Sequence, residues 1–361
     1  MKILVWQWGR KGAGPRYAAE LAASLATVPG TSAVLSLSAQ AELLQGETPP
    51  DCAPPDCALP FPTYTGLPSL LLRLPRLPFE LPALTRRLRA LAPDLAICAM
   101  PAVLDLAMVT ALRRAGIPFH VVVHDADPHP GDDVPLQMTL QRALIRRADG
   151  LIALTGHVAD RLRQHGLVGN RPLVMTTHPP FPFGDRPPAP RHHGGKLRLL
   201  SFGRLLPYKG LDLLAETLRA LGPRDDIEVR VVGQGPASSD LTALVGLPNV
   251  TVENRWVPES EVGALLAWAD ALVLSHREAS QSGVAAAAIA ARRWIVATRV
   301  GGITEQLAAE PLARLAPPEA APLAAAIASL ITHPPVDTGA DDPRAVWRAV
   351  AARLVRDLAR G

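Results

Sequence analysis

The sequence predicts an α/β protein that consists of two doubly wound domains. Short β-rich runs alternate with helical patterns along all 361 residues. Many of these runs are apolar on both faces, as parallel strands covered by helices on each side require. Residues 179–195 contain too much proline and glycine for regular structure, and they divide the alternation in two. A chain of this length can form two domains that each bury a core.

The β-rich runs supply six strands to each domain. We place the first domain at residues 1–185 and the second at residues 186–341. The expected strands are Lys2–Trp6, Ser32–Ser38, Asp94–Met100, Phe119–Asp125, Gly150–Thr155 and Pro172–His178 in the first domain, and Leu197–Gly203, Ile227–Gly233, Asn249–Asn254, Ala271–Ser275, Trp294–Val300 and Ala313–Ala316 in the second.

The end of the chain, residues 342–361, is expected to form a helix that docks on the folded body. The first domain is one surface on which it could dock. Its apolar residues lie close to one helical face, which a docked helix buries. These residues are Val346, Trp347, Val350, Leu354 and Leu358.

Residues 46–82 are rich in proline and interrupt the alternation of strands and helices. We expect an irregular loop over the core of the first domain, because proline breaks a long amphipathic helix. The alternative is contact with a membrane surface through residues 70–89, where leucines interleave with arginines. At such a surface the side-chain stems bury and the guanidinium groups meet phosphates.

Composition sets limits on the class of protein. With 48% hydrophobic and 19% charged residues, the chain is an ordinary soluble globular protein and not a disordered one. The net charge of +4 favours anionic partners without selecting among nucleotides, lipid head groups and nucleic acid. We expect a cytoplasmic protein, because we find no cleavable leader and no run of eighteen apolar residues. Three cysteines cannot close a disulfide set.

Two cations stand at a predicted strand-to-helix turn in the segment Ser201–Gly210. Arg204 and Lys209 follow a buried strand and precede leucines at helical spacing. Anions bind well at such a turn, because the free amides of a helix start add to the side-chain charges. Arginine can fork across two phosphate oxygens while lysine supplies a point charge, so the pair suits a diphosphate. The alternative is a pair of solvated cations at a surface turn.

A second polar segment, residues 276–284, follows the expected strand Ala271–Ser275. Ligands of open α/β sheets bind at the carboxyl ends of strands, so the carboxylate of Glu278 would point into a cleft and accept hydrogen bonds from sugar hydroxyls. The amides around Gly283 could receive phosphate or hydroxyl oxygens. The alternative is a common serine-type helix cap with Glu278 exposed.

Taken together, these segments resemble the family four retaining glycosyltransferases of the GT-B fold, the glycosyl transferases of group 1. The resemblance is dense over residues 197–307. Within them, residues 278–284 carry the Glu-Ala-Ser-Gln-Ser-Gly-Val variant of the family motif. In the first domain it is looser, and rests on the loops Gly9–Gly14 and His124–His129. The motifs of the second domain begin at Phe202, Val231, Asn249, Glu278 and Thr298.

The resemblance implies two Rossmann-like domains that face each other across a cleft, with the acceptor bound by the first and the nucleotide-sugar donor by the second. It implies that Arg204 and Lys209 hold the donor diphosphate, that Glu278 bonds donor-sugar hydroxyls, and that His124 lies beside the anomeric carbon. The remaining residues that it places around the donor are Gly12, Gly14, Gly203, Gly233, Arg255, Trp256, Val257, Ser282, Gly283, Val284 and Glu305.

The sequence departs from the family at one position. The family pairs two carboxylates, but Ala286 stands where the second is expected, eight positions after Glu278. That residue typically grips the nucleotide ribose in the family. We expect that the absence of this carboxylate weakens ribose binding, or that another residue contacts the ribose. We do not expect it to abolish catalysis, since the phosphate and sugar contacts remain.

Four side chains in the loop His124–His129 could instead suggest a metal site, because imidazole and carboxylate are common ligands. We expect a metal-free loop in which Asp125 and Asp127 orient the loop or the acceptor, and we assign no role to His129. We expect no metal and no cofactor, because two cations can stabilise the leaving diphosphate. The loop Gly9–Gly14 is neither a Walker sequence nor a nicotinamide fingerprint.

We therefore expect a retaining glycosyltransferase that moves a sugar from a nucleoside-diphosphate donor to a saccharide or lipid-linked acceptor, in cell-surface polysaccharide or glycolipid biosynthesis. Closure of the cleft would exclude water and bring His124 to the donor. No nucleic-acid partner is expected. Two alternatives remain: a nucleotide-sugar-binding protein without transfer activity, which the loss at Ala286 suggests, and an epimerase of the same fold.

Overall fold

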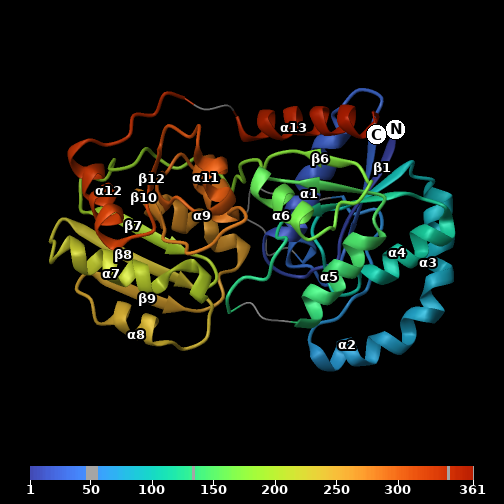
Figure 1. The fold of residues 1–361 in the computed structure, drawn as a ribbon, viewed down its shortest axis with the longest axis horizontal. Coiled ribbons are helices and arrows are strands. Elements are labelled where there is room, and N and C mark those ends of the chain that lie inside the picture. The colour runs from blue at the N-terminus through green and yellow to red at the C-terminus, as the bar shows by residue number, and fades with distance from the viewer. Residues whose placement is uncertain (46–55, 132–134, 340–341, 361) are drawn as a thin grey trace.

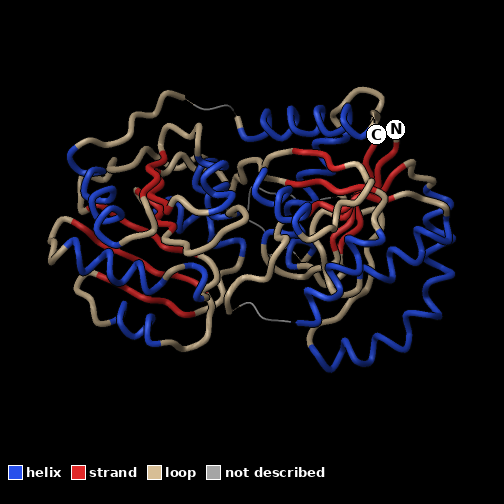
Figure 2. The backbone as a smooth tube through the Cα atoms, in the orientation of Figure 1, coloured by secondary structure: helices blue, strands red, loops and turns tan. Residues whose placement is uncertain are grey.

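The fold consists of two lobes, each built around a six-stranded parallel sheet (Figure 1). The structure is a computed structural model, and it describes residues 1–45, 56–131, 135–339 and 342–360. Helices lie on both sides of the strands in each lobe (Figure 2). The predicted fold class, two doubly wound α/β domains, is confirmed.

The sheet of the first lobe has the strand order β2-β1-β3-β4-β5-β6. All of its paired strands run parallel, with β1 between β2 and β3, so the strand order reverses at β1. Ligands of such sheets bind at the carboxyl ends of the strands near a reversal of this kind. The strands are β1 Lys2–Gln7, β2 Ser32–Leu37, β3 Leu95–Cys98, β4 Phe119–Val123, β5 Gly150–Ala153 and β6 Leu173–Met175.

The sheet of the second lobe has the order β12-β11-β10-β7-β8-β9, also parallel throughout. Here the order reverses at β7, so the loops after β7 and β10 leave the sheet side by side. The strands are β7 Leu197–Phe202, β8 Ile227–Gly233, β9 Val250–Asn254, β10 Ala271–Leu274, β11 Trp294–Thr298 and β12 Ala313–Ala316.

Each sheet carries a separate apolar core on each of its faces. Alternate side chains of β1 enter different cores, Leu4 on one face and Ile3 on the other, because successive residues of a strand point to opposite faces. The helices that cover the faces are α1 Ala13–Ala26, α4 Asp105–Ala115, α5 Pro135–Arg147, α6 Gly156–Gln164, α7 Leu211–Leu221, α8 Ser239–Val245, α9 Glu259–Trp268, α10 Gly283–Ala290, α11 Gly301–Leu307 and α12 Ala320–Thr332.

The last helix, α13 Pro343–Leu358, returns from the second lobe and packs against α1 of the first (Figure 1). Its Trp347 is buried in the same core as Tyr17 and Phe181. The indole nitrogen of Trp347 also donates to the Pro180 carbonyl over 2.8 Å. The helix therefore ties the segment between the lobes to the first lobe.

The expectation of an irregular loop is wrong for residues 67–82, which belong to a helical stretch that runs to residue 91. The stretch consists of α2 Leu67–Arg73, a 3-10 turn η2 Leu74–Arg76, and α3 Leu77–Leu91. Pro68, Pro75 and Pro78 are tolerated because they stand in the first turns of their segments, where the missing N–H has no intrahelical partner to lose, whereas Pro82 lies inside α3. Residues 46–55 of the proline-rich stretch lie outside the described residues.

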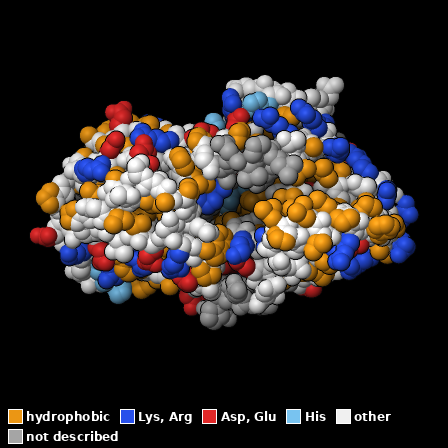
Figure 3. Space-filling view, turned by 90° about the horizontal axis from the view of Figure 1, so that it is seen from below, with side chains coloured by type: hydrophobic (Ala, Val, Ile, Leu, Met, Phe, Trp, Pro, Cys, Tyr) orange, Lys and Arg blue, Asp and Glu red, His pale blue; other side chains and the backbone are white. Residues whose placement is uncertain are grey.

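Large apolar side chains of this helical stretch are exposed. Figure 3 shows hydrophobic side chains gathered on one face of the first lobe, beside Lys and Arg side chains. Within the described ranges, no helix is both long enough and apolar enough to cross a bilayer. The exposed apolar residues of the stretch are Leu67, Leu71, Leu72, Leu74 and Phe79.

Candidate functional site

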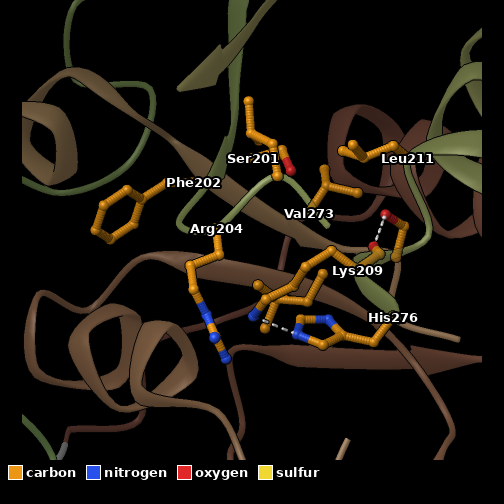
Figure 4. Close-up of a pocket in the computed structure, with 10 residues that line it drawn as sticks. Ser201, Phe202, Arg204, Lys209, Leu211, Val273 and His276 are labelled. Atoms are coloured by element: carbon orange, nitrogen blue, oxygen red, sulfur yellow. Dashed lines mark hydrogen bonds between the residues drawn. The ribbon is translucent and has the colours of Figure 1, made fainter. Parts of the chain in front are cut away.

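The loop after β7 brings the two predicted cations to one small cavity. Arg204 follows β7, and Lys209 ends the short 3-10 turn η3 Pro207–Lys209 that leads into α7. Both side chains line a cavity of about 10 Å³ together with His276 (Figure 4). That volume has room for one water at most, so a diphosphate would lie on the open side of the two cations.

Hydrogen bonds fix both cations in place. Arg204 donates from Nη2 to the Tyr208 hydroxyl over 2.9 Å, and Lys209 Nζ lies 2.9 Å from Nε2 of His276 (Figure 4). Burial is the main cause that lowers the pKa of Lys209 to about 8, and the positive charge of Arg204 lowers it further. The negative charge of Asp125 acts in the opposite direction. Burial and Lys209 hold the pKa of His276 well below its usual value, so the neutral imidazole accepts from Lys209.

Two glycines let the backbone of this turn pack closely. Gly210 adopts a φ of 66° between η3 and α7, and a Cβ there would lie 2.0 Å from the Ser275 carbonyl oxygen. A Cβ on Gly233 would lie 1.6 Å from the carbonyl oxygen of Gly203. Gly203 and Gly233 therefore hold the ends of β7 and β8 together under the loop that carries Arg204.

His124 lies between the two domains, just after β4. It is buried, and its Nε2 lies 2.8 Å from the Ala99 carbonyl, to which only an N–H can donate. Nδ1 is then the acceptor, and it receives the side-chain amide of Gln281 over 3.1 Å. Burial lowers the pKa of His124 and so favours this neutral form.

Glu278 faces the loop after β4 of the first domain. Its Oε1 lies 3.5 Å from Nδ1 of His129, whose Nε2 contacts the Asp125 carboxylate over 2.8 Å. The His129 ring stacks on Tyr208 at a centroid distance of 4.5 Å. The sequence interpretation assigned no role to His129, yet the structure places it against the turn that carries Arg204 and beside Glu278.

The start of α10 presents backbone amides after Glu278. Ser282 caps the helix, since its hydroxyl accepts from the Ala285 amide over 3.2 Å. The Ser282 amide itself already donates to Oε1 of Gln306 over 2.8 Å. Gly283 and Val284 occupy the first two helical positions, where no intrahelical carbonyl can accept from their amides.

The glycine-rich loop of the first domain meets this helix start. A Cβ on Gly283 would lie 3.9 Å from the Cβ of Ala13, the first residue of α1. Gly12, with a φ of 79°, precedes Ala13 and forms the turn into α1. Gly14 is packed against the side chains of Gln7 and Met100, which leave no room for a Cβ at this position.

The turn Arg255–Val257, expected beside the base and ribose, is held mainly by charges of its own domain. Arg255 donates to Glu253 over 3.0 Å and lies 2.7 Å from the Glu261 carboxylate. The ammonium of Lys11, from the first domain, lies 5.0 Å from the centre of the Trp256 ring. Val257 packs partly buried against the core of the second domain.

Glu305 is engaged at a different interdomain contact. Its two carboxylate oxygens accept from the amides of Gly156 and His157, at 2.6 and 2.8 Å. These amides open α6, so the carboxylate also meets the positive end of that helix. A contact between Glu305 and the donor would require this cap to open.

Ala286, at the position of the missing carboxylate, is fully buried. Its carbonyl accepts from the Phe181 amide over 3.1 Å, and its side chain belongs to the core that also holds Trp347. The first domain and the interdomain segment therefore cover this position with apolar groups.

The acidic and histidine side chains of the loop after β4 diverge. Asp127 pairs with Arg161 and His165, each at 2.6 Å, while Asp125 pairs with His129. In the part of the chain that the structure describes, no group of three or more Asp, Glu, His or Cys side chains could hold a metal ion.

Two family models match the chain, one for each lobe. Residues 196–333 match the family described as Glycosyl transferases group 1, and residues 12–179 match the Glycosyl transferase 4-like domain. The chain therefore belongs to the group 1 glycosyltransferases and has their two-domain GT-B fold.

A characterised relative is the 2-deoxystreptamine glucosyltransferase of Streptomyces kanamyceticus, which is 27% identical. The match covers 63% of this chain and 65% of the relative, less than two thirds of that protein's length.

Solved structures resemble nearly the whole chain. The sucrose-phosphate synthase of Thermosynechococcus elongatus has a TM-score of 0.67 at 17% identity, over 99% of this chain and 98% of its own. The Anabaena protein Alr3699/HepE, in complex with UDP and glucose, has a TM-score of 0.67 at 19% identity, over 100% of this chain and 98% of its own. The UDP-GlcNAc 2-epimerase of Neisseria meningitidis has a TM-score of 0.58 at 11% identity, over 100% of both chains. At these identities the likeness shows the fold alone.

Proposed function

We propose that the chain is a metal-independent retaining glycosyltransferase that moves a sugar from a nucleoside-diphosphate donor in the second domain to an acceptor bound by the first. The observation that carries this proposal is the fixed pair of cations, Arg204 and Lys209, at the carboxyl end of the first strand of the second domain. Two preorganised positive charges suit a leaving group that gains negative charge in the transition state.

The donor would lie along the loops after β7 and β10. Its diphosphate would meet Arg204, Lys209 and the amides at the start of α10, where the helix adds partial positive charge. The side chain of Glu278 is 45% exposed, and its carboxylate would accept hydrogen bonds from sugar hydroxyls. Retention of configuration is expected if the leaving phosphate helps to deprotonate the acceptor on the same face.

His124 would face the reacting carbon once the donor is bound. Gln281 now engages the side of the His124 ring that points toward the second domain. The interdomain contacts of Gln281 with His124 and of Glu278 with His129 would open to admit a donor, and the lobes would then close around it. Closure would exclude water from the reacting groups.

A uridine diphosphate sugar is the first donor to test. The relative from Streptomyces is named as a glucosyltransferase, and the Anabaena structures contain UDP, glucose or UDP-glucose. A thermal-shift panel of UDP, GDP and ADP with their glucose and mannose derivatives would identify the base, because a bound ligand stabilises the folded state by mass action.

The acceptor is proposed to be a saccharide or a lipid-linked saccharide of a cell-surface polysaccharide or glycolipid. The exposed leucines of α2 and η2, with Phe79 of α3, offer an apolar face beside arginines, which suits peripheral contact with an anionic membrane. Flotation with vesicles of phosphatidylglycerol and phosphatidylcholine tests this contact. Equal failure of the wild type and a Leu71→Ser/Leu72→Ser variant to float would remove it.

Substitutions at the site test the transfer activity. Lys209→Ala and Glu278→Ala should each lower transfer by on the order of a hundredfold or more, as the loss of one charge-stabilising group does. Lys196→Ala, at an exposed position, is the matched control. Unchanged turnover in both site variants would contradict the assignment.

The alternatives have distinct products. A protein that only binds nucleotide sugars should release no nucleoside diphosphate from the donor, even slowly. An epimerase should convert the donor without any acceptor. Incubation with the responsive donor, followed by chromatography of the nucleotide products, separates all three activities.

A further inference from the structure

His129 occupies a junction between the two domains that the proposed transfer mechanism does not use. It belongs to the loop after β4 of the first domain, and it is 7% exposed. Its ring stacks on Tyr208, whose hydroxyl receives the Arg204 guanidinium. Two residues further on, Gly131 lies so close to Pro207 that a Cβ would come within 2.5 Å of it. The loop is thus seated on the turn that carries both proposed phosphate ligands.

The two nitrogens of His129 face two different carboxylates. Nε2 lies 2.8 Å from Oδ1 of Asp125 in the same loop, and Nδ1 lies 3.5 Å from Oε1 of Glu278 in the second domain. Nδ1 is buried and makes no hydrogen bond with any residue that the structure describes. A buried nitrogen in this position, aimed at a carboxylate, is one small movement away from an ion-paired hydrogen bond.

The protonation state decides whether that bond can form. A neutral His129 has one N–H, which the Asp125 carboxylate accepts, and its Nδ1 lone pair then faces Glu278 unfavourably. A protonated His129 donates from both nitrogens and joins the two carboxylates. The second state links the first-domain loop to the residue proposed to bind donor-sugar hydroxyls.

We propose that His129 is a positioning residue which, when protonated, bridges Asp125 to Glu278 and thereby fixes the Glu278 carboxylate for the donor sugar. The inference rests on the proposed function, because it assigns Glu278 to the donor. It adds a residue of the acceptor domain to the machinery that orients the donor.

The charges around His129 support the protonated form. Burial lowers its pKa, but the hydrogen bond and charge of Asp125, with the charge of Glu278, raise the pKa above its usual value overall. The charge of Arg204, in the loop after β7, disfavours protonation of His129. His276, in the loop after β10, also lies close to His129. A diphosphate beside Arg204 would offset that opposing charge and favour the proton further.

The first experiment measures the bridge without any donor. The imidazole of His129 is titrated by long-range proton–nitrogen NMR in the full chain, with His129→Gln to assign its signal. In Glu278→Gln the pKa of His129 should fall by about 0.5 or more, since a neighbouring negative charge is removed. The matched control is Glu319→Gln, far along the chain at the start of α12. An equal pKa in the wild type and in Glu278→Gln would overturn the proposal.

The second experiment follows donor use against pH. With UDP-glucose as the probe, kcat/KM of the wild type should decline as pH rises through the His129 pKa measured in the first experiment, in addition to the decline above about pH 8 that the loss of charge on Lys209 causes. His129→Gln should lack the first decline and keep the second. His192→Gln, at an exposed linker position, should retain both. A decline centred at the His129 pKa that persists in His129→Gln overturns the inference. If no nucleotide binds the wild type, the proposed function is contradicted instead.

Discussion

Gln281 of the second domain donates its side-chain amide to Nδ1 of His124 in the first domain, over 3.1 Å. The bond joins the loop after β10 to the loop after β4 at the place where the proposed reaction occurs. It also defines the tautomer of His124, because Nε2 is already committed to the Ala99 carbonyl. The two domains therefore meet through the imidazole of His124, the group that would face the anomeric carbon.

Replacing Gln281 by leucine should destabilise the free protein. The substitution removes the donor to His124 and leaves a buried ring nitrogen without a partner, at a cost of about 1–3 kcal/mol. Urea unfolding measures this loss. Gln234→Leu, at an exposed position after β8, should change the free energy of unfolding far less. Equal effects of the two substitutions would show that the interdomain bond is not formed in solution.

Binding of a nucleoside diphosphate should weaken as the solution becomes more basic. Lys209 has a pKa of about 8 in the free protein, so it carries its charge below that pH and loses it above. An anionic ligand favours the charged form, and its affinity should fall by up to about tenfold per pH unit above 8. Calorimetry between pH 7 and 9 measures this. Lys209→Arg should move the decline to higher pH, and a decline at the same pH in both proteins would exclude Lys209 as its origin.

Restoring the missing carboxylate should damage the fold. Ala286 is fully buried and packs beside Phe181, so the side chain of Ala286→Glu would enter an apolar core without a partner. An uncompensated buried carboxylate costs several kcal/mol. Thermal unfolding should therefore occur at a markedly lower temperature than for Ala290→Glu, at a partly exposed position of the same helix. Tighter nucleotide binding with normal stability in Ala286→Glu would contradict this account of the position.

The last helix should contribute to stability through one aromatic side chain. Trp347 packs edge-on against Tyr17, whose ring in turn contacts His124. Trp347→Ala should cost about 3–5 kcal/mol of unfolding free energy, as for other buried aromatic residues. Arg348→Ala, exposed on the same helix, is the control and should be near neutral. A loss below about 1 kcal/mol would mean that α13 is not docked on α1.

The fold could be predicted from the sequence because buried parallel strands leave a local signal. All twelve expected strands occur, with ends that differ by a few residues, since runs such as Ala271–Leu274 are apolar and buried on both faces. The helical structure of residues 67–82 could not be predicted in the same way. Its prolines suggested a loop, and only the structure shows that most of them fall in first turns.

The site was predictable to the extent that it is local. Arg204 and Lys209 converge because one strand-to-helix turn carries both of them, and that turn is visible in the sequence. The partners His129 and Gln281 depend on how two domains meet, which no spacing within one segment specifies. The same is true of Glu305, whose carboxylate caps a helix of the other domain.

The most direct test of the central claim is calorimetric titration of UDP, GDP and ADP into the wild type, Lys209→Ala and Arg204→Ala. At least one nucleotide should bind the wild type, and each variant should bind it about ten- to a hundredfold more weakly, the loss expected for one charge-assisted contact. Equal affinity of all three proteins for that nucleotide would contradict the account, because the diphosphate would then lie away from both cations.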